Sequence, residues 1–239
     1  MGALTLREAE SIFFIYAVLT AKYKIYKTIF FIFAFKSTTL NREEVIEKVA
    51  ILLKEIPTSL EIVKNDSKSD KRFHYLATHM VDKAIKKDAL VISENEKGIA
   101  ILFRTSKKDD NFFKEIPEQL GLLFNVTGFS NALKIMKSQS YIKAQRPAEG
   151  EYLYCWFWGI MTDARGADTQ TGKEMKDEFY RQAEEYKLPL YAETRMRQNA
   201  IVYKRFGFEL FHEWQHPSGD TMYFLRYIPK SLKSIDNSL

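Results

Sequence analysis

The spacing of apolar residues predicts two helices at the start of the main part of the chain. In residues 41–56, apolar side chains recur at the i, i+4, i+7, i+8 spacing of an amphipathic helix, and Pro57 would end that helix. A polar string at 64–71 predicts a loop, and a second helix follows over about 72–87. The main domain is therefore expected to open with a pair of helices.

A β-hairpin is predicted after the helix pair. Residues 89–93 and 98–105 are β-branched and apolar, and a polar turn at 94–97 separates them, so that the two strands should pair antiparallel. Residues 112–139 have the pattern of a helix in two pieces, broken near Gly128.

An almost uniformly apolar strand, YLYCWFWGI at 152–160, begins the carboxyl half. Such a strand is typical of one buried on both faces of a sheet. The elements predicted after it are a helix at 173–187, a strand at 188–193, a helix at 198–206, and a closing hairpin at 209–214 and 221–227. This order predicts a mixed α/β sheet whose ligand site lies in the β-loop-α unit at 152–187.

The amino-terminal segment, residues 1–37, stands apart from this pattern. Two apolar runs, 12–21 and 28–35, are separated by a stretch with three lysines, and neither run reaches the length of a membrane-spanning helix. We therefore divide the chain into an extension of uncertain role (1–37) and a main domain (38–239). A helix or hairpin packed on the main domain, or an extension peculiar to this chain, is favoured over a span, a signal peptide or a membrane-surface contact.

Composition narrows the class of protein. Hydrophobic residues make up 46% and charged residues 28% of the 239 residues, which is the balance of a globular chain with a real core. The single cysteine, Cys155, excludes a disulfide scaffold and favours a reducing, cytoplasmic location. The net charge of +5 lacks a clustered basic face, so that a nucleic-acid partner is not expected. The spacing of the four histidines suggests no metal site.

The carboxyl half resembles the GNAT superfamily of acyl-CoA-dependent N-acetyltransferases. The resemblance rests on the strand YLYCWFWGI with its following loop and helix, on LPLYAETRMRQNAIVYKRFGFEL at 188–210, and on the hairpin after it. It covers about residues 40–228. It implies an α/β (α+β) fold, a mixed, mostly antiparallel twisted sheet flanked by helices, here with an extra N-terminal hydrophobic segment. It also implies acetyl-CoA as cosubstrate and an amine-bearing acceptor.

The resemblance implies roles for particular residues. A central strand that splays from its neighbour would pair with the pantetheine arm, and the loop and helix N-terminus after it would bind the pyrophosphate. Tyr203 would protonate the departing CoA thiolate. The residues that would bind the cofactor are Ile160, Met161, Arg165, Gly166, Thr171, Gly172, Lys173 and Asn199. The loop departs from the family pattern, because it is about two residues longer and Asp168 puts a negative charge near the diphosphate.

The residues leave several alternatives open. Tyr203 suits a thiolate leaving group as an acid, but it could also be a half-buried packing tyrosine. Glu151 and Glu193 are the candidates for the general base, and Glu193 could instead fix a loop or a helix start. Trp156, Phe157 and Trp158 are expected in the core or in the walls of the cofactor slot.

The sequence therefore predicts an N-acetyltransferase that moves an acetyl group from acetyl-CoA directly to an amine, as a monomer or homodimer. The alternative is a GNAT-fold CoA-binding or regulatory protein without turnover, which the departure of the phosphate loop favours.

Overall fold

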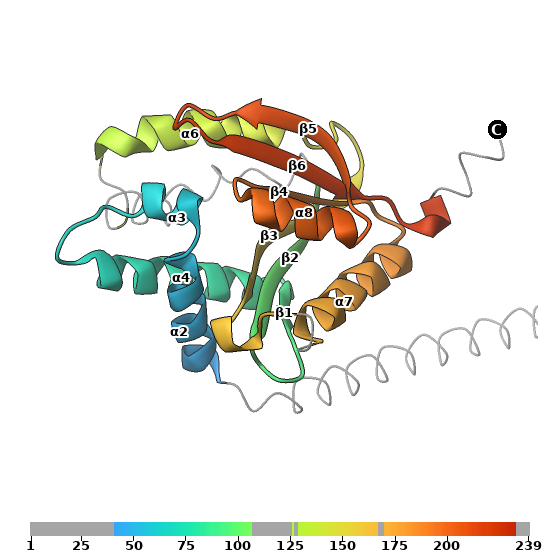
Figure 1. The fold of residues 1–239 in the computed structure, drawn as a ribbon, viewed down its shortest axis with the longest axis horizontal. Helices are drawn as coiled ribbons and strands as arrows, with labels where there is room; N and C mark the ends of the chain where they lie inside the picture. The colour runs from blue at the N-terminus through green and yellow to red at the C-terminus, as the bar shows by residue number, and fades with distance from the viewer. Residues whose placement is uncertain (1–40, 107–125, 127–128, 167–169, 233–239) are drawn as a thin grey trace, which may run out of the picture. The chain divides into compact units, whose positions relative to one another are not determined.

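The computed structural model describes residues 41–106, 126, 129–166 and 170–232 of the chain (Figure 1). Its centre is a six-stranded sheet in the order β1-β2-β3-β4-β6-β5. Neighbouring strands pair antiparallel, except that β3 and β4 run parallel. The strands are β1 (Leu90–Ile92), β2 (Gly98–Ser106), β3 (Glu151–Ile160), β4 (Leu190–Thr194), β5 (Glu209–Gln215) and β6 (Thr221–Tyr227). The predicted mixed, mostly antiparallel sheet is confirmed.

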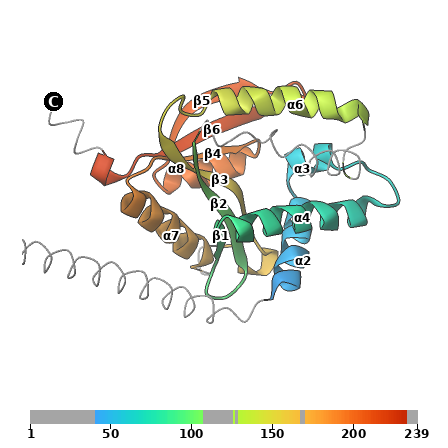
Figure 2. The ribbon, with the colours of Figure 1, turned by 180° about the vertical axis from the view of Figure 1, so that it is seen from behind.

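Helices cover both faces of this sheet (Figures 1 and 2). One face carries α7 and α8, which pack on an apolar cluster with β3, β4 and β6. The opposite face carries α2 and α4 near β1–β3, and α6 over β5 and β6. The helices are α2 (Arg42–Leu53), α3 (Pro57–Ile62), α4 (Ser69–Lys86), α6 (Phe129–Ala144), α7 (Thr171–Tyr186) and α8 (Arg197–Arg205), with a 3-10 turn η2 (Thr162–Ala164).

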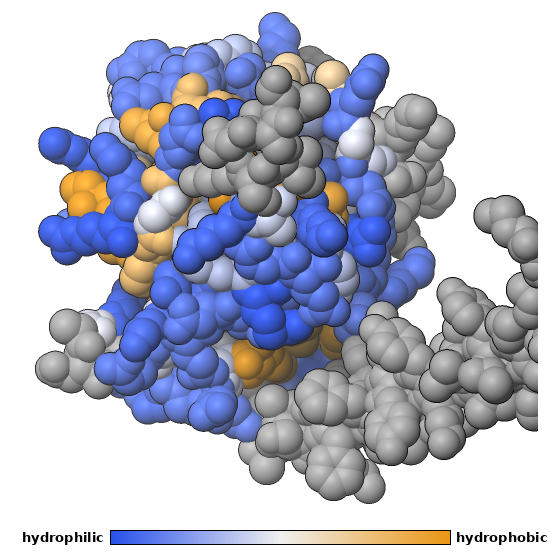
Figure 3. Space-filling model, turned by 90° about the vertical axis from the view of Figure 1, so that its right-hand side faces the viewer, coloured by the Kyte–Doolittle hydropathy of each residue, from blue (hydrophilic) through white to orange (hydrophobic). Residues whose placement is uncertain are grey.

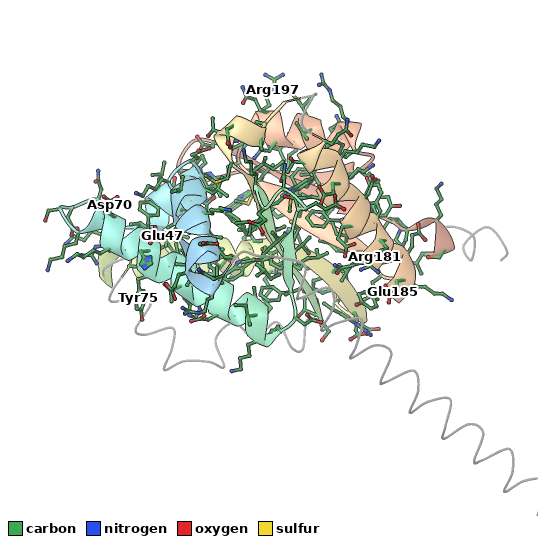
Figure 4. The ribbon with its side chains drawn as sticks, turned by 90° about the horizontal axis from the view of Figure 1, so that it is seen from below. Glu47, Asp70, Tyr75, Arg181, Glu185 and Arg197 are labelled. Atoms are coloured by element: carbon green, nitrogen blue, oxygen red, sulfur yellow. The ribbon has the colours of Figure 1, made fainter. Side chains whose placement is uncertain are left out.

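The helix α7 illustrates why the spacing of apolar residues predicted the helices of this fold. Met175, Phe179 and Ala183 are buried against the sheet, and Arg181 and Glu185 form an ion pair on the outward side of the helix (Figure 4). Apolar residues at this spacing form a single stripe on a helix, which fixes the face that packs inward.

Two predicted boundaries were wrong. Pro57 follows α2 but begins a further helix, α3, since proline at the first helical position has no N–H to leave unpaired. The predicted loop at 64–71 is shorter than expected, because α4 starts at Ser69. The first piece of the predicted helix at 112–139, and the amino-terminal segment 1–37, lie outside the described residues.

A β-bulge at Trp156 changes which side chains of β3 face which helices. Ile101 pairs with Phe157 and Leu102 pairs with Cys155, so that Trp156 is the extra residue. Before the bulge Cys155 faces the α7 side, and after it Trp158 does. The bulge therefore keeps both Cys155 and Trp158 on the face covered by α7 and α8.

None of the helices in the described residues combines the length and the apolar character needed to cross a bilayer. The described residues also contain no group of three or more side chains suited to hold a metal ion. Figure 3 shows the side of the molecule that carries α7 as largely hydrophilic, with apolar side chains in separate small patches.

We expect Gly98→Ala to destabilise the fold by about 1–2 kcal/mol. A Cβ at Gly98 would lie 2.3 Å from the Met175 Sδ and 2.9 Å from the Thr171 Cγ2, so that these two buried side chains must shift out of their packed positions. Urea unfolding measures the loss. Gly172→Ala is the matched control, because its Cβ would meet ordinary contacts of 3.4 Å or more. Equal stability of the two variants would contradict this close approach.

Candidate active site between two diverging strands

The strands β3 and β4 separate along their length. They pair only at Leu153↔Leu190 and Tyr154↔Tyr191, near the start of both strands. Beyond this point β3 continues to Ile160 with β2 as its partner, and β4 continues to Thr194 with β6 as its partner. In the described part of the chain, the β4-side edge of β3 thus has no strand partner from Cys155 onward. An extended ligand can hydrogen-bond to such an edge as an added strand would.

The phenol of Tyr203 lies where this divergence begins. Tyr203, in α8, is 9% exposed, and its Oη is 3.9 Å from the Sγ of Cys155, the first residue of β3 beyond the paired end. Its ring packs edge-on against Trp158 and Phe208, with centroids at 5.4 and 5.0 Å. Burial, and then the neighbouring Cys155, raise the pKa of Tyr203 well above its ordinary value of 10. The phenol is therefore neutral and able to donate a hydrogen bond.

Cys155 is a buried free thiol next to this phenol. It is 6% exposed, and burial raises the pKa of its thiol to about 12. A thiol held protonated in this way is a poor nucleophile. Cys155 therefore forms part of the wall of the gap and does not suit covalent catalysis.

The amino terminus of α7 points its first turn toward the end of β3. Gln170 enters the helix in a left-handed conformation, with φ 40°, and Gly166 has φ 128°, which favours glycine. A Cβ on Gly172 would make only ordinary contacts, 3.4 Å from Ile160 and 3.8 Å from Phe206. The protein itself thus does not require glycine at this position, and the missing side chain leaves room beside the end of β3. Asp168 lies outside the described residues.

Two predicted cofactor residues have side chains that serve the protein's own structure. Thr171 is 1% exposed, and its hydroxyl accepts a hydrogen bond from the Asn95 amide at 2.7 Å. Arg165 donates to the Ile160 carbonyl at 2.7 Å and to the Glu55 carboxylate at 2.6 Å. These contacts tie the loop after β3 to the β1–β2 turn and to the segment after α2. The expected positive charge of Arg165 is therefore paired with a carboxylate in this structure.

The other predicted cofactor residues are distributed around the gap. Ile160 ends β3, while the N–H of Met161 donates to the Lys97 carbonyl at 2.8 Å. Lys173 is exposed in the first turn of α7. Asn199 is exposed too, with its amide 3.4 Å from the Met196 Sδ. Asn199 lies one helical turn before Tyr203 in α8, but it is exposed whereas Tyr203 is buried.

The structure adds a polar cluster that the sequence analysis only touched on. On the face of the gap opposite α8, the Tyr154 hydroxyl donates to the Oε1 of Glu193, and Arg146 approaches the same oxygen at 3.4 Å. The guanidinium of Arg146 also lies over the Tyr154 ring, 3.5 Å from its centroid. Alternation along two neighbouring strands could have placed Tyr154 and Glu193 on one face, but no local pattern points to Arg146 in the turn after α6. Glu151, the other sequence candidate for the general base, is not part of this cluster. It begins β3 and forms an ion pair with Arg104.

Comparison with solved structures shows which fold this is. The chain is similar to a Corynebacterium glutamicum structure described as histone acetyltransferase HPA2 and related acetyltransferase, at 14% identity and TM-score 0.57, over 80% of this chain and 93% of that one. It is also similar to the C-terminal condensation domain of Ebony, at 10% identity and TM-score 0.51, over 79% and 95%. A Drosophila melanogaster polyamine N-acetyltransferase matches at 9% identity and TM-score 0.51, over 78% and 96%.

These similarities show the GNAT fold, as the sequence predicted. No protein-family model matches the sequence, and no curated protein matches it significantly. At such low identity the solved structures establish the architecture, and the activity has to be argued from the site of this chain.

Proposed function

We propose that this protein is an N-acetyltransferase that moves an acetyl group from acetyl-CoA to an amine. The observation that carries the proposal is the gap where β3 leaves β4, with the neutral phenol of Tyr203 at its base. A strand edge that can pair with a pantetheine arm and an acid aimed at the same point are the two parts that thioester aminolysis needs. The proposal includes a cytoplasmic location, which the single cysteine favours.

The proposed reaction is direct. The neutral amine nitrogen attacks the thioester carbonyl, the carbon–sulfur bond breaks, and Tyr203 gives its proton to the departing thiolate. The phenolate then takes the one proton that the attacking nitrogen loses, so that Tyr203 ends as it began and the products are the amide and free CoA. Most of the rate enhancement would come from holding the two substrates in line, with backbone amides of β3 polarising the carbonyl.

The cofactor would lie on the α7–α8 side of the gap. The edge of β3 from Cys155 to Ile160 would hold the pantetheine arm, and the N–H groups of Thr171, Gly172 and Lys173 would face the pyrophosphate at the amino terminus of α7. The hydroxyl of Thr171 and the guanidinium of Arg165 take no direct part in this proposal, since each already has a protein partner.

Acetyl-CoA is expected to stabilise the chain and Gly172→Ala to abolish that effect. At a concentration of 100 Kd the ligand contributes about 2.7 kcal/mol. For a domain of this size, that raises the melting temperature by roughly 5–10 °C. A methyl at Gly172 would point at Ile160 and Phe206, into the proposed slot, while the fold stays intact. Thermal shift with and without acetyl-CoA makes the comparison. An equal shift in the variant would place the cofactor elsewhere.

The second candidate is a CoA-binding protein of this fold without turnover. It is favoured by the contact between Arg165 and Glu55, which neutralises the cation of the phosphate loop. Free-thiol release with a panel of amines separates the two functions. Agmatine and polyamines belong in this panel, because the Drosophila neighbour is described as an enzyme that forms N-acetylagmatine. Binding of acetyl-CoA without thiol release from any amine would favour the second candidate.

A further inference from the structure

The outward side of α8 carries positive charges that the described fold does not neutralise. Within the described residues, every arginine except Arg197 and Arg205 forms an ion pair with a carboxylate. Both of these arginines lie on α8, and so does Lys204, for which the described residues also supply no ion pair. The helix itself contains no acidic residue. A local excess of positive charge of this kind suits contact with an acidic partner.

Apolar side chains lie among these cations. Ile201 and Val202 are each 42% exposed. Arg197, Ile201 and Arg205 follow one another at i, i+4 and i+8, so that they form one row along the helix, which Val202 and Lys204 border on its two sides. We call these five residues the α8 outer face, and Figure 4 shows Arg197 pointing away from the molecule. Exposed apolar side chains flanked by arginines are typical of protein–protein interfaces.

The helix α8 connects this surface with the proposed acid. Tyr203 follows Ile201 by two positions, so that the two side chains leave the helix in nearly opposite directions. Tyr203 is 9% exposed and reaches Cys155 at the gap, whereas Ile201 faces solvent. An α-helix is only about 10 Å across with its side chains. A partner on the α8 outer face would therefore lie about one helix diameter from the point where the proposed thioester reacts.

The donor side of the gap is better equipped for a pantetheine arm than for the nucleotide of CoA. The edge of β3 from Cys155 onward can pair with such an arm. Arg165, the cation in the loop after β3, is instead held by Glu55. A pantetheine arm that is attached through its phosphate to a protein would use the strand edge and would need no site for a nucleotide diphosphate.

We propose that the α8 outer face docks an acidic carrier protein, which delivers the acetyl group on a phosphopantetheine arm. This inference rests on the proposed acetyl transfer and names a macromolecular donor for it. Carboxylates of the carrier would pair with the three cations, and an apolar side chain between them would pack on Ile201. The amine nitrogen attacks the carrier-bound thioester and the carbon–sulfur bond breaks. Tyr203 gives its proton to the departing thiolate and recovers one from the nitrogen, so that the carrier leaves with a free thiol.

The test supplies the acetyl group on two donors, acetyl-CoA and an acidic acyl carrier protein whose phosphopantetheine thiol is acetylated. Thiol release with one amine gives kcat/KM for each donor. We expect the unaltered chain to use the carrier at least about tenfold better than acetyl-CoA. The double variant Arg197→Glu, Arg205→Glu should lower the value for the carrier about 30-fold and that for acetyl-CoA less than about twofold. Ile201→Ser should lower only the value for the carrier, by about fivefold.

The matched control is Lys86→Glu with Lys87→Glu. These lysines are exposed at the end of α4, next to Ile85, which is itself 41% exposed, so that the change of charge and the apolar neighbour are alike. Both donors should keep their kcat/KM in this variant. Salt gives a measurement on the unaltered chain: raising the ionic strength from about 0.05 to about 0.5 M should lower kcat/KM for the carrier about tenfold. The same salt should change the value for the Arg197, Arg205 variant much less.

Several outcomes would overturn the inference while acetyl transfer stands. One is equal use of the two donors by the unaltered chain, and another is an equal loss in the lysine control. A fall for acetyl-CoA as large as that for the carrier would assign the cations to the nucleotide of CoA. Binding to phosphatidylserine vesicles that Arg197→Glu with Arg205→Glu abolishes, without preference for the carrier, would assign them to a membrane surface. Absence of thiol release from both donors with every amine would refute the proposed function itself.

Discussion

Replacing Tyr203 by phenylalanine is expected to lower kcat about 100-fold or more while leaving acetyl-CoA binding unchanged. A positioned acid contributes roughly 10²–10⁴ to such a step. The change removes only the hydroxyl, whose partner within the protein is the Cys155 thiol at 3.9 Å. The aromatic contacts with Trp158 and Phe208 stay, so that the free energy of unfolding should change by no more than about 1 kcal/mol.

Tyr180→Phe provides the matched control for this prediction. Tyr180 packs in the same aromatic cluster, but its hydroxyl donates to the Phe206 carbonyl, whereas that of Tyr203 contacts Cys155. Its loss should leave kcat nearly unchanged. Because burial holds the pKa of Tyr203 well above 10, the rate profile of the unaltered chain should show no limb from this group between about pH 6 and 9. A Tyr203→Phe variant with full kcat would refute the assignment of the acid.

The fold could be predicted because its elements carry strong local patterns. Residues 98–105 and 152–160 are apolar enough to be buried strands, and α7 has a single apolar stripe. The error at Pro57 arose because the same residue type is compatible with two positions relative to a helix. Proline ends the helix before it and can also begin the next, and the sequence around Pro57 gave no means of choosing.

The site was less predictable, because its parts depend on pairing between distant segments. The position of Tyr203 at the divergence follows from which residues of β3 pair with β4. The almost uniformly apolar sequence of β3 has no alternation of apolar and polar residues that would indicate this register. Thr171 and Arg165 were expected at the phosphates because they stand in the loop and helix start. Their side chains instead bond to Asn95 and Glu55, which lie far away in sequence.

Arg195→Met is expected to cost about 2 kcal/mol of stability. Arg195 follows β4, and its side chain is 2% exposed. It contacts Glu61 of α3 at 2.6 Å, and Ser218 at 2.6 Å and Asp220 in the β5–β6 turn. Removing one member of a buried pair costs about 3–5 kcal/mol. Here the carboxylates of Glu61 and Asp220 are 42% and 47% exposed, so that water recovers part of that loss. Urea unfolding near neutral pH measures the change.

The pH dependence of this loss distinguishes the ion pairs from simple packing. A hydrogen bond from Arg195, opposed by partial burial, lowers the pKa of Glu61 below its ordinary value of 4.5. A lowered carboxyl pKa stabilises the fold above the ordinary value, and this stability is lost as pH falls through the lowered one. The difference in unfolding free energy between the unaltered chain and Arg195→Met should therefore shrink below about pH 4.5.

Arg226→Met, which breaks a more exposed pair with Glu209, should cost less than about 1 kcal/mol. A loss at Arg195 that persists unchanged in acid would mean that the side chain acts by filling space, and the link between α3 and the β5–β6 turn would then not be electrostatic.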